Sequence, residues 1–144
     1  MADIFTKKKR SLLMANVRSS GNEATEKTFV RELKRRKITG WRLHLRLPGT
    51  PDVSFPRAKT CVFLHGCFWH GCPRCYRVPK VNQAFWRTKV ENNRIRDRRV
   101  VRQLRAAGWH VLIFWQCSLR RKTISRSLTR LERALTDGIK RRQT

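Results

Sequence analysis

Residues 51–75 read PDVSFPRAKTCVFLHGCFWHGCPRC, and the rest of the chain is organised around them. Two short apolar runs, residues 53–55 and 61–64, favour β-strands, and the four residues between them are rich in charge and turn formers. This pattern predicts a hairpin. Asp52 enters the first strand and His65 leaves the second, so the two residues are expected at the same side of the sheet. We therefore expect a site between them.

The composition indicates a polyanionic partner. The 144 residues suffice for one domain with a single core, and they carry 35 Lys and Arg against nine Asp and Glu, a net charge of +26. Such a field attracts polyanions, of which nucleic acid is the strongest candidate. A solvated basic surface without a ligand is the plainer alternative. Residues 1–20 are expected to form a basic arm or short helix, and residues 21–144 a single domain.

The sequence predicts neither secretion nor a membrane span. The longest fully apolar run, residues 111–115, is far shorter than the ~20 residues of a spanning helix, and the basic start lacks a following apolar stretch. We therefore expect a protein of the cytoplasm. Five cysteines in a reducing compartment favour metal binding over a disulfide framework.

Hydrophobic periodicity predicts the remaining elements. Their order is a helix over residues 22–37, a strand over 41–47, the hairpin, a helix over 82–107, a strand over 109–115 and a closing helix over 123–140. The strand over 109–115 is a continuous apolar run except for His110, so it is expected to be central and covered on both faces. This order predicts an α/β sandwich.

Two acidic residues fall on the apolar stripes of these helices. Glu26 lies one turn before Phe29, and Asp97 lies between Asn93 and Val101. A carboxylate on a buried face needs a partner. For Asp97 the alternatives are an ion pair with a neighbouring arginine or a bond that orients a catalytic histidine. For Glu26 they are a structural pair, which is favoured, or a role in the site.

Four cysteines have the spacing of a metal site. Cys72 and Cys75 form a Cys-x2-Cys knuckle, Cys67 precedes it, and Cys117 follows the last predicted strand. Four thiolates complete a closed tetrahedral site without room for water, so one structural Zn²⁺ per chain is expected. The alternative is that these are ordinary buried cysteines, which we expect of Cys61.

The residues after Asp52 match a known nuclease pattern only in part. Enzymes of the restriction-endonuclease-like fold cut phosphodiesters with a Pro-Asp pair and, on the next strand, an acid, one further residue and a lysine. Residues 63–65 read Phe-Leu-His, so the second acid is missing and a histidine replaces the lysine. Taken alone, this stretch predicts a nuclease only weakly.

Over nearly its whole length the chain resembles the very short patch repair (Vsr) endonucleases of bacteria. The motifs that carry the resemblance are LPGxPD at 47–52, FxHGCFWH at 63–70, FW at 85–86 leading to Asn93, RDRR at 96–99 and AGW at 107–109. The resemblance implies an α/β fold of the restriction-endonuclease-like (PD-(D/E)xK) type, with a central mixed sheet flanked by helices and a zinc-stapled loop. It also implies a Mg²⁺-dependent endonuclease that nicks one strand of duplex DNA beside the thymine of a T:G mispair, as left by deamination of 5-methylcytosine.

The resemblance further implies how the catalytic cation is held. Asp52 is the direct Mg²⁺ ligand together with the backbone carbonyl of Leu64. This carbonyl supplies the oxygen ligand that the missing second acid would provide. Glu26 resembles the carboxylate that holds a water of the cation. Glu23 is a reserve candidate for that acid, because the polar linker before Glu26 differs from the family's usual run.

By the same resemblance, His70 is the base that activates water, Asp97 orients it, and His65 contacts the scissile phosphate. An imidazole takes a proton from water near neutral pH, and a buried carboxylate on its other nitrogen fixes the tautomer. The remaining matched residues would recognise the mispair: Phe68 and Trp69 wedge into the base stack, Met14 and Val17 insert from the opposite groove, and Lys89 and Asn93 contact the mispaired bases.

The resemblance places the protein in the bacterial cytoplasm, at the nucleoid. It implies a functional link to a DNA cytosine methyltransferase, with polymerase and ligase completing the repair. A nicking enzyme on an asymmetric lesion needs one active site, so a monomer is the simplest expectation. One departure concerns zinc, because the family's better-known sites have a histidine where this chain has Cys72. Two other functions stay open, namely a restriction-type nuclease that cuts matched duplex and a non-catalytic zinc-stapled DNA-binding protein.

Overall fold

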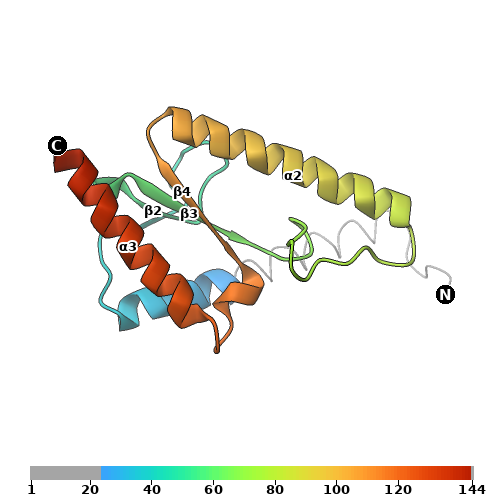
Figure 1. The fold of residues 1–144 in the computed structure, drawn as a ribbon, viewed down its shortest axis with the longest axis horizontal. Coiled ribbons are helices and arrows are strands. Elements are labelled where there is room, and N and C mark those ends of the chain that lie inside the picture. The colour runs from blue at the N-terminus through green and yellow to red at the C-terminus, as the bar shows by residue number, and fades with distance from the viewer. Residues whose placement is uncertain (1–23, 144) are drawn as a thin grey trace.

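The computed structural model describes residues 24–143, which form a mixed sheet packed between helices (Figure 1). The first helix is described over residues 24–35 and is called the leading helix below. The other elements, in chain order, are β1 (Arg42–Leu43), β2 (Val53–Phe55), the 3-10 turn η1 (Pro56–Ala58), β3 (Thr60–His65), α2 (Gln83–Ala106), β4 (His110–Trp115), the 3-10 turn η2 (Gln116–Leu119) and α3 (Ile124–Gln143). The predictions for Met14, Val17 and Glu23 lie outside the described residues.

The predicted hairpin is confirmed. β2 and β3 pair antiparallel, with Ser54 opposite Cys61, and η1 joins them. Pro56 sets the backbone at the start of this turn, and Lys59, at φ +47°, takes the left-handed conformation that returns the chain. β1 pairs antiparallel with β2, whereas β4 pairs parallel with β3, so the sheet is mixed and has the order β1-β2-β3-β4.

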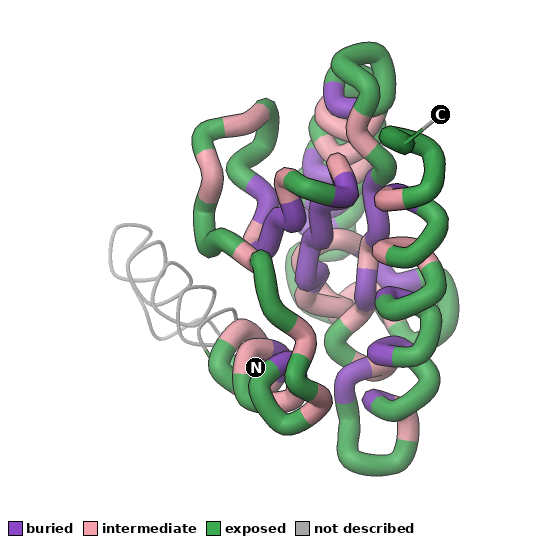
Figure 2. Tube along the Cα trace, turned by 90° about the vertical axis from the view of Figure 1, so that its left-hand side faces the viewer, coloured by how far each residue is buried: buried purple, intermediate pink, exposed green. Residues whose placement is uncertain are grey.

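Successive residues of β3 belong to two cores, one on each face of the sheet. Val62 and Leu64 lie in the core that includes the apolar stripes of the leading helix and α3. Cys61 and Phe63 lie in the core that includes Leu104 of α2. Figure 1 shows α2 and α3 on opposite sides of the strands, and the buried segments in Figure 2 gather along the strands between them. The predicted helix, sheet and helix layers are therefore confirmed.

β4 is an edge strand among the described residues, which corrects the expectation that the 109–115 run is central. Both of its faces are nevertheless covered, because Leu112 and Phe114 belong to the first core while Val111 and Ile113 pack in the second. Two covered faces require apolar residues at every position, whether or not a further strand pairs with the edge. The central strands are β2 and β3.

The strand predicted over residues 41–47 is mostly wrong. Only Arg42 and Leu43 pair with β2 before His44 turns to a φ of +50°. The His44 N–H still donates to the Asp52 carbonyl at 3.3 Å, and the chain then leaves the sheet. Trp41, Leu45 and Leu47 are half-buried, whereas Leu43 is exposed, so the sequence alternation matches burial only in part.

α2 follows the predicted helix closely. Asn82 precedes its first residue, and Gly108, at φ +87°, ends it in the left-handed region that favours glycine. The predicted stripe faces inward, since Trp86, Val90, Asn93 and Leu104 are buried. Within residues 24–143, neither α2 nor any other helix combines the length and apolar character needed to cross a membrane.

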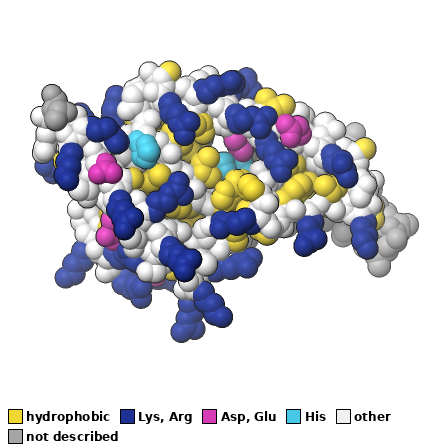
Figure 3. Space-filling view, viewed as in Figure 1, with side chains coloured by type: hydrophobic (Ala, Val, Ile, Leu, Met, Phe, Trp, Pro, Cys, Tyr) yellow, Lys and Arg dark blue, Asp and Glu magenta, His cyan; other side chains and the backbone are white. Residues whose placement is uncertain are grey.

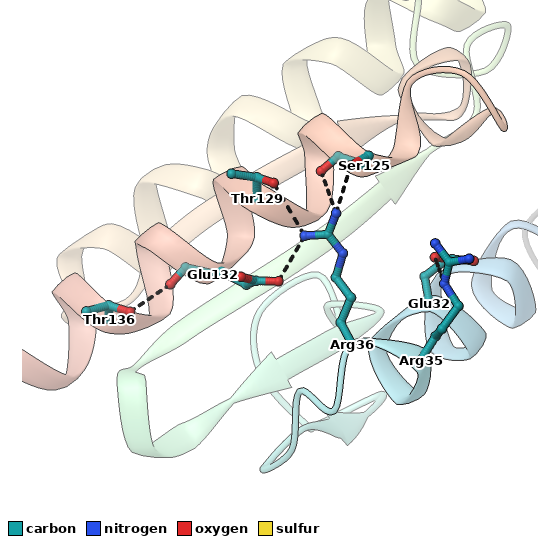
Figure 4. A network of polar contacts seen from close by, with 7 residues as sticks. All are labelled: Glu32, Arg35, Arg36, Ser125, Thr129, Glu132 and Thr136. Atoms are coloured by element: carbon teal, nitrogen blue, oxygen red, sulfur yellow. Dashed lines mark hydrogen bonds and ion pairs between the residues drawn. The ribbon is translucent and has the colours of Figure 1, made fainter.

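Arg36 ties the end of the leading helix to α3 (Figure 4). Its guanidinium donates to Glu132 at 2.9 Å, to Thr129, and to both the carbonyl and the hydroxyl oxygen of Ser125. A planar group with several fixed donors holds two elements in one relative orientation. Because the leading helix also carries Glu26, this contact helps to position that carboxylate.

Candidate active site and cysteine centre

Asp52 lies immediately before β2, and its side chain reaches across the hairpin to β3. Its Oδ2 accepts a hydrogen bond from the Leu64 N–H at 2.7 Å. Burial raises the pKa of the Asp52 carboxyl; the Leu64 bond opposes this effect, and the nearby Glu26 carboxylate adds to it. Two carboxylates in a partly desolvated place favour the arrival of a cation.

Glu26 and His44 complete this first group with Asp52, which we call the cation cluster. Nε2 of His44 lies 2.8 Å from Oε2 of Glu26, and one donor atom from each of the three residues lies within 4.8 Å of the others. Carboxylate oxygens and an imidazole nitrogen suit a divalent cation. The sequence did not single out His44. A signal existed, because it is one of only four histidines, but its place in an alternating stretch made it look like a strand residue.

His65, His70 and Asp97 form a second group, the histidine cluster. The Nδ1–H of His70 donates to Oδ2 of Asp97 at 2.7 Å, so the half-buried Asp97 pairs with a histidine. The rings of His65 and His70 are stacked, with centroids 3.9 Å apart and 8° between their planes. Burial opposes ionisation of Asp97, but the hydrogen bond from His70 and its charge outweigh it and lower the pKa of this carboxyl. Asp97 is therefore an anion that fixes the orientation of the His70 ring.

His65 ends β3 and is only 6% exposed. Burial, helped by the adjacent His70 and opposed by Asp97, lowers the pKa of His65 to about 4. The imidazole is therefore neutral at pH 7. Its Nδ1 is buried without a hydrogen-bond partner among residues 24–143, an exception to the rule that buried polar atoms are paired.

The two clusters are neighbours at one end of the hairpin. The start of β2 and the end of β3 meet there because these strands run antiparallel, and His70 acts electrostatically on Asp52. The expectation of a site between Asp52 and His65 needs one refinement. Asp52 lies with Glu26 and His44, whereas His65 lies with His70 and Asp97.

A cavity of about 520 Å³ adjoins the histidine cluster. The three cluster residues line it together with arginines from one face of α2, namely Arg94, Arg98, Arg102 and Arg105. Guanidinium groups are well suited to phosphate oxygens, because their fixed donors can bind in pairs. The cavity therefore offers phosphate-binding groups next to His65 and His70.

Phe68 and Trp69 are half-buried in an aromatic cluster and do not stand free of the protein surface. The Phe68 ring lies 5.4 Å from Trp69 and 5.2 Å from Trp86 of α2, both edge to face. Trp69 also contacts Trp86, at 6.0 Å. Phe85, which packs on Trp86, is 55% exposed. The aromatic pair Phe68 and Trp69 thus packs against Trp86 of α2 and is only partly exposed to solvent.

Asn93 holds the backbone of this aromatic pair. Its side chain is buried, and Nδ2 donates to the Trp69 carbonyl at 2.8 Å. Its Oδ1 accepts a bond from Arg96 at 3.3 Å. Lys89, one turn earlier on α2, is exposed. Of the two residues expected to reach the bases, Lys89 is accessible, and Asn93 positions the loop.

The four predicted ligand cysteines come together beyond the end of β4. Cys67, Cys72 and Cys75 come from the loop after β3 and Cys117 from η2, and their sulfur atoms all lie within 4.8 Å of one another. Cys72 and Cys117 are 3.8 Å apart. Ligands of a tetrahedral zinc with Zn–S bonds of about 2.3 Å are also roughly 3.8 Å apart, so the set fits this ion. Cys61 does not belong to this set. It lies in the core that includes Leu104 of α2, where burial raises the pKa of its thiol to about 12.

Hydrogen-bond donors surround these sulfurs. Burial opposes ionisation of Cys72, but the backbone N–H groups of Arg74 and Cys75 help to lower the pKa of this thiol to about 7. The Arg74 guanidinium lies 3.6 Å from Cys117 Sγ and donates to Ser118 at 2.6 Å. Donors of this kind stabilise thiolates, the form in which cysteine binds metal. The cluster could therefore hold zinc.

Basic side chains cover the surface around these sites. Lys and Arg are spread over most of the face shown in Figure 3, and acidic groups appear at few places on it. This distribution agrees with the net charge of +26. A surface of this kind suits the phosphate backbone of a nucleic acid.

Comparison with known proteins gives a consistent result. The family model of the DNA mismatch endonuclease Vsr matches residues 2–77. The chain is 38% identical, over 127 residues, to the DNA mismatch endonuclease Vsr of Escherichia coli (83% of this chain, 77% of the relative). It is 44% identical over 122 residues to the type II nicking enzyme V.XorIIP of Xanthomonas oryzae pv. oryzae (83% and 88%). It is 37% identical over 145 residues to the type II nicking enzyme V.NmeAIP of Neisseria meningitidis (96% and 100%).

Proposed function

Because this chain belongs to the Vsr family of DNA mismatch endonucleases, we propose that it nicks duplex DNA beside the thymine of a T:G mispair, with Mg²⁺ as cofactor. Deamination of 5-methylcytosine opposite guanine leaves such a mispair. The observation that carries the proposal is the His70–Asp97 pair next to the Asp52 carboxylate. A base and a cation site are the two groups that hydrolysis of a phosphodiester most needs.

The surroundings of Asp52 suit Mg²⁺, which prefers oxygen ligands and keeps several waters. Asp52 and the Leu64 carbonyl would bind the ion directly, and Glu26 would hold it through a water. Glu23 is the reserve for that acid and lies outside the described residues. Bound there, Mg²⁺ supplies Lewis-acid stabilisation of the negative charge that develops on the scissile phosphate.

The histidine cluster handles the proton and the phosphate. His70 takes a proton from the attacking water at Nε2, because its Nδ1–H is held by Asp97. Asp97 thereby fixes the tautomer that a base requires. His65, neutral at pH 7, contacts the scissile phosphate as a hydrogen-bond donor.

A restriction-endonuclease-like (PD-(D/E)xK) framework is the proposed origin of this arrangement. Its support is the Pro-Asp pair before β2 and the placement of Leu64 and His65 at the end of the next strand, where the general pattern has a residue and a lysine. Residues 21–144 would form the nuclease domain and residues 1–20 the arm. A monomer suffices, because one active site cuts one strand.

The aromatic pair would recognise the mispair by unstacking it. Inserting apolar side chains between base steps costs roughly a few kcal/mol, and the cost is least where pairing is already weak. Phe68 and Trp69 would enter from one groove, and Met14 and Val17 of the arm from the other. Lys89 would then contact the mispaired bases. Asn93 would either keep its hydrogen bond to the Trp69 carbonyl or give up this bond and contact a base instead.

Replacing Trp69 by alanine should weaken binding to a T:G duplex by ~1–3 kcal/mol, the usual value of one base–aromatic stack. Binding to matched duplex, which rests on phosphate contacts, should hardly change, so the preference for the mispair shrinks toward one. Titration of both duplexes with the same protein sample measures this ratio, which does not depend on the folded fraction.

Trp109 provides the matched control for Trp69. Trp109 is also half-buried. It lies just before the start of β4, whereas the four-cysteine cluster lies beyond the end of that strand. Trp109→Ala should leave the ratio of the two affinities unchanged. An equal loss on matched and mispaired DNA in Trp69→Ala would mean that Trp69 is a general contact, and the unstacking role would pass to Phe68 or be abandoned.

One Zn²⁺ per chain is proposed for the four-cysteine cluster. Because all four positions are taken by thiolates, the ion would be structural and would fasten the loop of the aromatic pair to η2. Cys117→Ser should lower zinc content, the melting temperature and nicking together, since a structural zinc contributes folding free energy directly. Elemental analysis and thermal unfolding measure the first two effects.

Cys61 is the matched control for Cys117. At position 61 alanine is a better replacement than serine, because a serine hydroxyl would be buried without a partner in the core that includes Leu104 of α2. Cys61→Ala should keep one zinc per chain. Full zinc occupancy in Cys117→Ser would show that the fourth ligand is wrongly assigned.

One assay tests the function against its alternatives. A T:G duplex and its matched control are incubated with the protein in Mg²⁺ and in chelator. The proposal predicts nicking of the mispaired duplex alone, and only with Mg²⁺. Equal cutting of matched duplex would favour a restriction-type nuclease, and binding without any cutting would favour a zinc-stapled DNA-binding protein.

In the cell, a cytosine methyltransferase would create the need for this repair, and a polymerase and a ligase would finish it.

A further inference from the structure

His44 is the member of the cation cluster to which the proposed function gives no role. It follows β1 at a φ of +50°, in the left-handed region that residues other than glycine seldom adopt. Such conformations gather at functional sites, where surrounding contacts hold them. Two contacts hold this one, because the His44 N–H donates to the Asp52 carbonyl at 3.3 Å and Nε2 pairs with Glu26.

The donor atoms of the cluster are spaced like ligands of one ion. Nε2 of His44 and Oε2 of Glu26 are 2.8 Å apart. Adjacent ligands of an octahedral ion with bonds of about 2.0–2.1 Å lie roughly 2.8–3.0 Å apart. An oxygen of Asp52 completes a set whose atoms all lie within 4.8 Å of one another. The three residues come from separate parts of the chain, yet the fold brings their donor atoms to one point.

Charge and access also favour a ligand. Glu26 and Asp52 place two carboxylates beside a single imidazole, so the cluster attracts a further positive charge. The His44 side chain is 55% exposed while that of Glu26 is 20% exposed, so an ion from solvent can reach Nε2 and replace its proton. The plainer alternative is that His44 only orients the Glu26 carboxylate through their hydrogen bond.

We propose that His44 is a protein ligand of the catalytic cation, through Nε2, and that Glu26 binds the same ion directly and not through a water, so that an imidazole nitrogen joins the oxygen ligands from Asp52, Glu26 and the Leu64 carbonyl. The inference rests on the proposed function, which assigns the cation to Asp52. Nitrogen ligands suit transition-metal ions better than they suit Mg²⁺ or Ca²⁺. The site therefore takes Mn²⁺ in preference to Mg²⁺, with His44 responsible for much of the difference.

Pulsed electron paramagnetic resonance of added Mn²⁺ tests this ligand directly. The probe is Mn²⁺ itself, added to the full-length, zinc-loaded protein without DNA, so the measurement does not depend on nicking. A ¹⁴N modulation of the Mn²⁺ echo reports a bound imidazole. We expect the modulation in wild type and its loss in His44→Ala, together with an affinity for Mn²⁺ that falls by about tenfold or more.

Two further variants, His44→Gln and His110→Ala, serve as controls. Glutamine at position 44 can still donate a hydrogen bond to Glu26 but offers no imidazole, so His44→Gln should lose the ¹⁴N modulation as His44→Ala does. His110→Ala removes an exposed histidine at the far end of β4 and should keep the wild-type signal. The inference is overturned if wild type shows no ¹⁴N modulation, or if either His44→Ala or His44→Gln keeps it.

Asp52→Asn separates this inference from the proposed function. It should weaken Mn²⁺ and Mg²⁺ binding alike, whatever the role of His44. Should Asp52→Asn bind both ions as wild type does, the cation site of the proposed function is elsewhere, and that assignment fails on its own account. A loss of binding in Asp52→Asn with an unchanged ¹⁴N signal in His44→Ala would contradict the His44 ligand alone.

Discussion

Replacing Asp52 by asparagine is expected to slow nicking of a T:G duplex at least about a thousandfold, a loss of about 4 kcal/mol of transition-state stabilisation. Asparagine has nearly the shape of aspartate and still offers an oxygen to the Leu64 N–H, so the 2.7 Å bond within the hairpin can persist. What it lacks is the negative charge that would hold the cation. Single-turnover rates on an end-labelled duplex measure the loss.

Binding provides the second readout for Asp52→Asn. Affinity for mispaired DNA should persist or rise, because a carboxylate that faces phosphate is removed. The matched control is Asp137→Asn, which removes an exposed carboxylate from α3 and should cut at the wild-type rate. Nicking by Asp52→Asn within tenfold of wild type would exclude Asp52 from the site.

The second large effect is expected from the His70–Asp97 pair. His70→Ala should slow nicking by roughly 10²–10⁴-fold, the usual contribution of a general base. Asp97→Ala should also be severely slow, because His70 then loses the partner that orients it at 2.7 Å. The double variant should be little slower than His70→Ala, since Asp97 acts through His70.

Glu91→Ala is the matched control on the same helix. Glu91 is an exposed carboxylate that pairs with Arg94 and Arg98, and exposed pairs of this kind contribute little. Its loss should leave the nicking rate nearly unchanged. Losses of His70 and Asp97 that multiply in the double variant would contradict a coupled pair.

Local signals in the sequence predicted most of the elements. The hairpin from Val53 onward was recognisable because β-favouring runs flank a turn that begins with Pro56. The extent of α2 was recognisable because Gly108 ends its apolar stripe. These features depend on neighbours within a few positions along the chain, which a single sequence contains.

The two errors in the fold arise from contacts that are distant in sequence. An apolar run such as residues 109–115 shows that both faces are covered, but the number of paired neighbours depends on other strands, and β4 has only β3 among the described residues. The alternating stretch 41–47 leaves the sheet at His44, whose left-handed backbone goes with contacts to Glu26 and Asp52. Neither contact is visible in local periodicity.

Members of the candidate site could be singled out from the sequence where they broke a pattern. Asp97 stood out as an acid on an apolar stripe, and it pairs with His70 in the structure. The cysteines stood out by their spacing, and their sulfurs meet. His44 did not break the pattern around it, and so only the fold reveals its place beside Glu26.

Mismatch-directed nicking is tested most directly by labelling the two strands of one T:G duplex differently at their ends and identifying the strand that is cut. With Mg²⁺, we expect a single product, from cleavage of the thymine strand next to the mispaired thymine. The guanine strand should stay intact, and the matched duplex should stay uncut on both strands. Cleavage of both strands, or equal cleavage of the matched duplex, would contradict a mismatch-directed nicking enzyme.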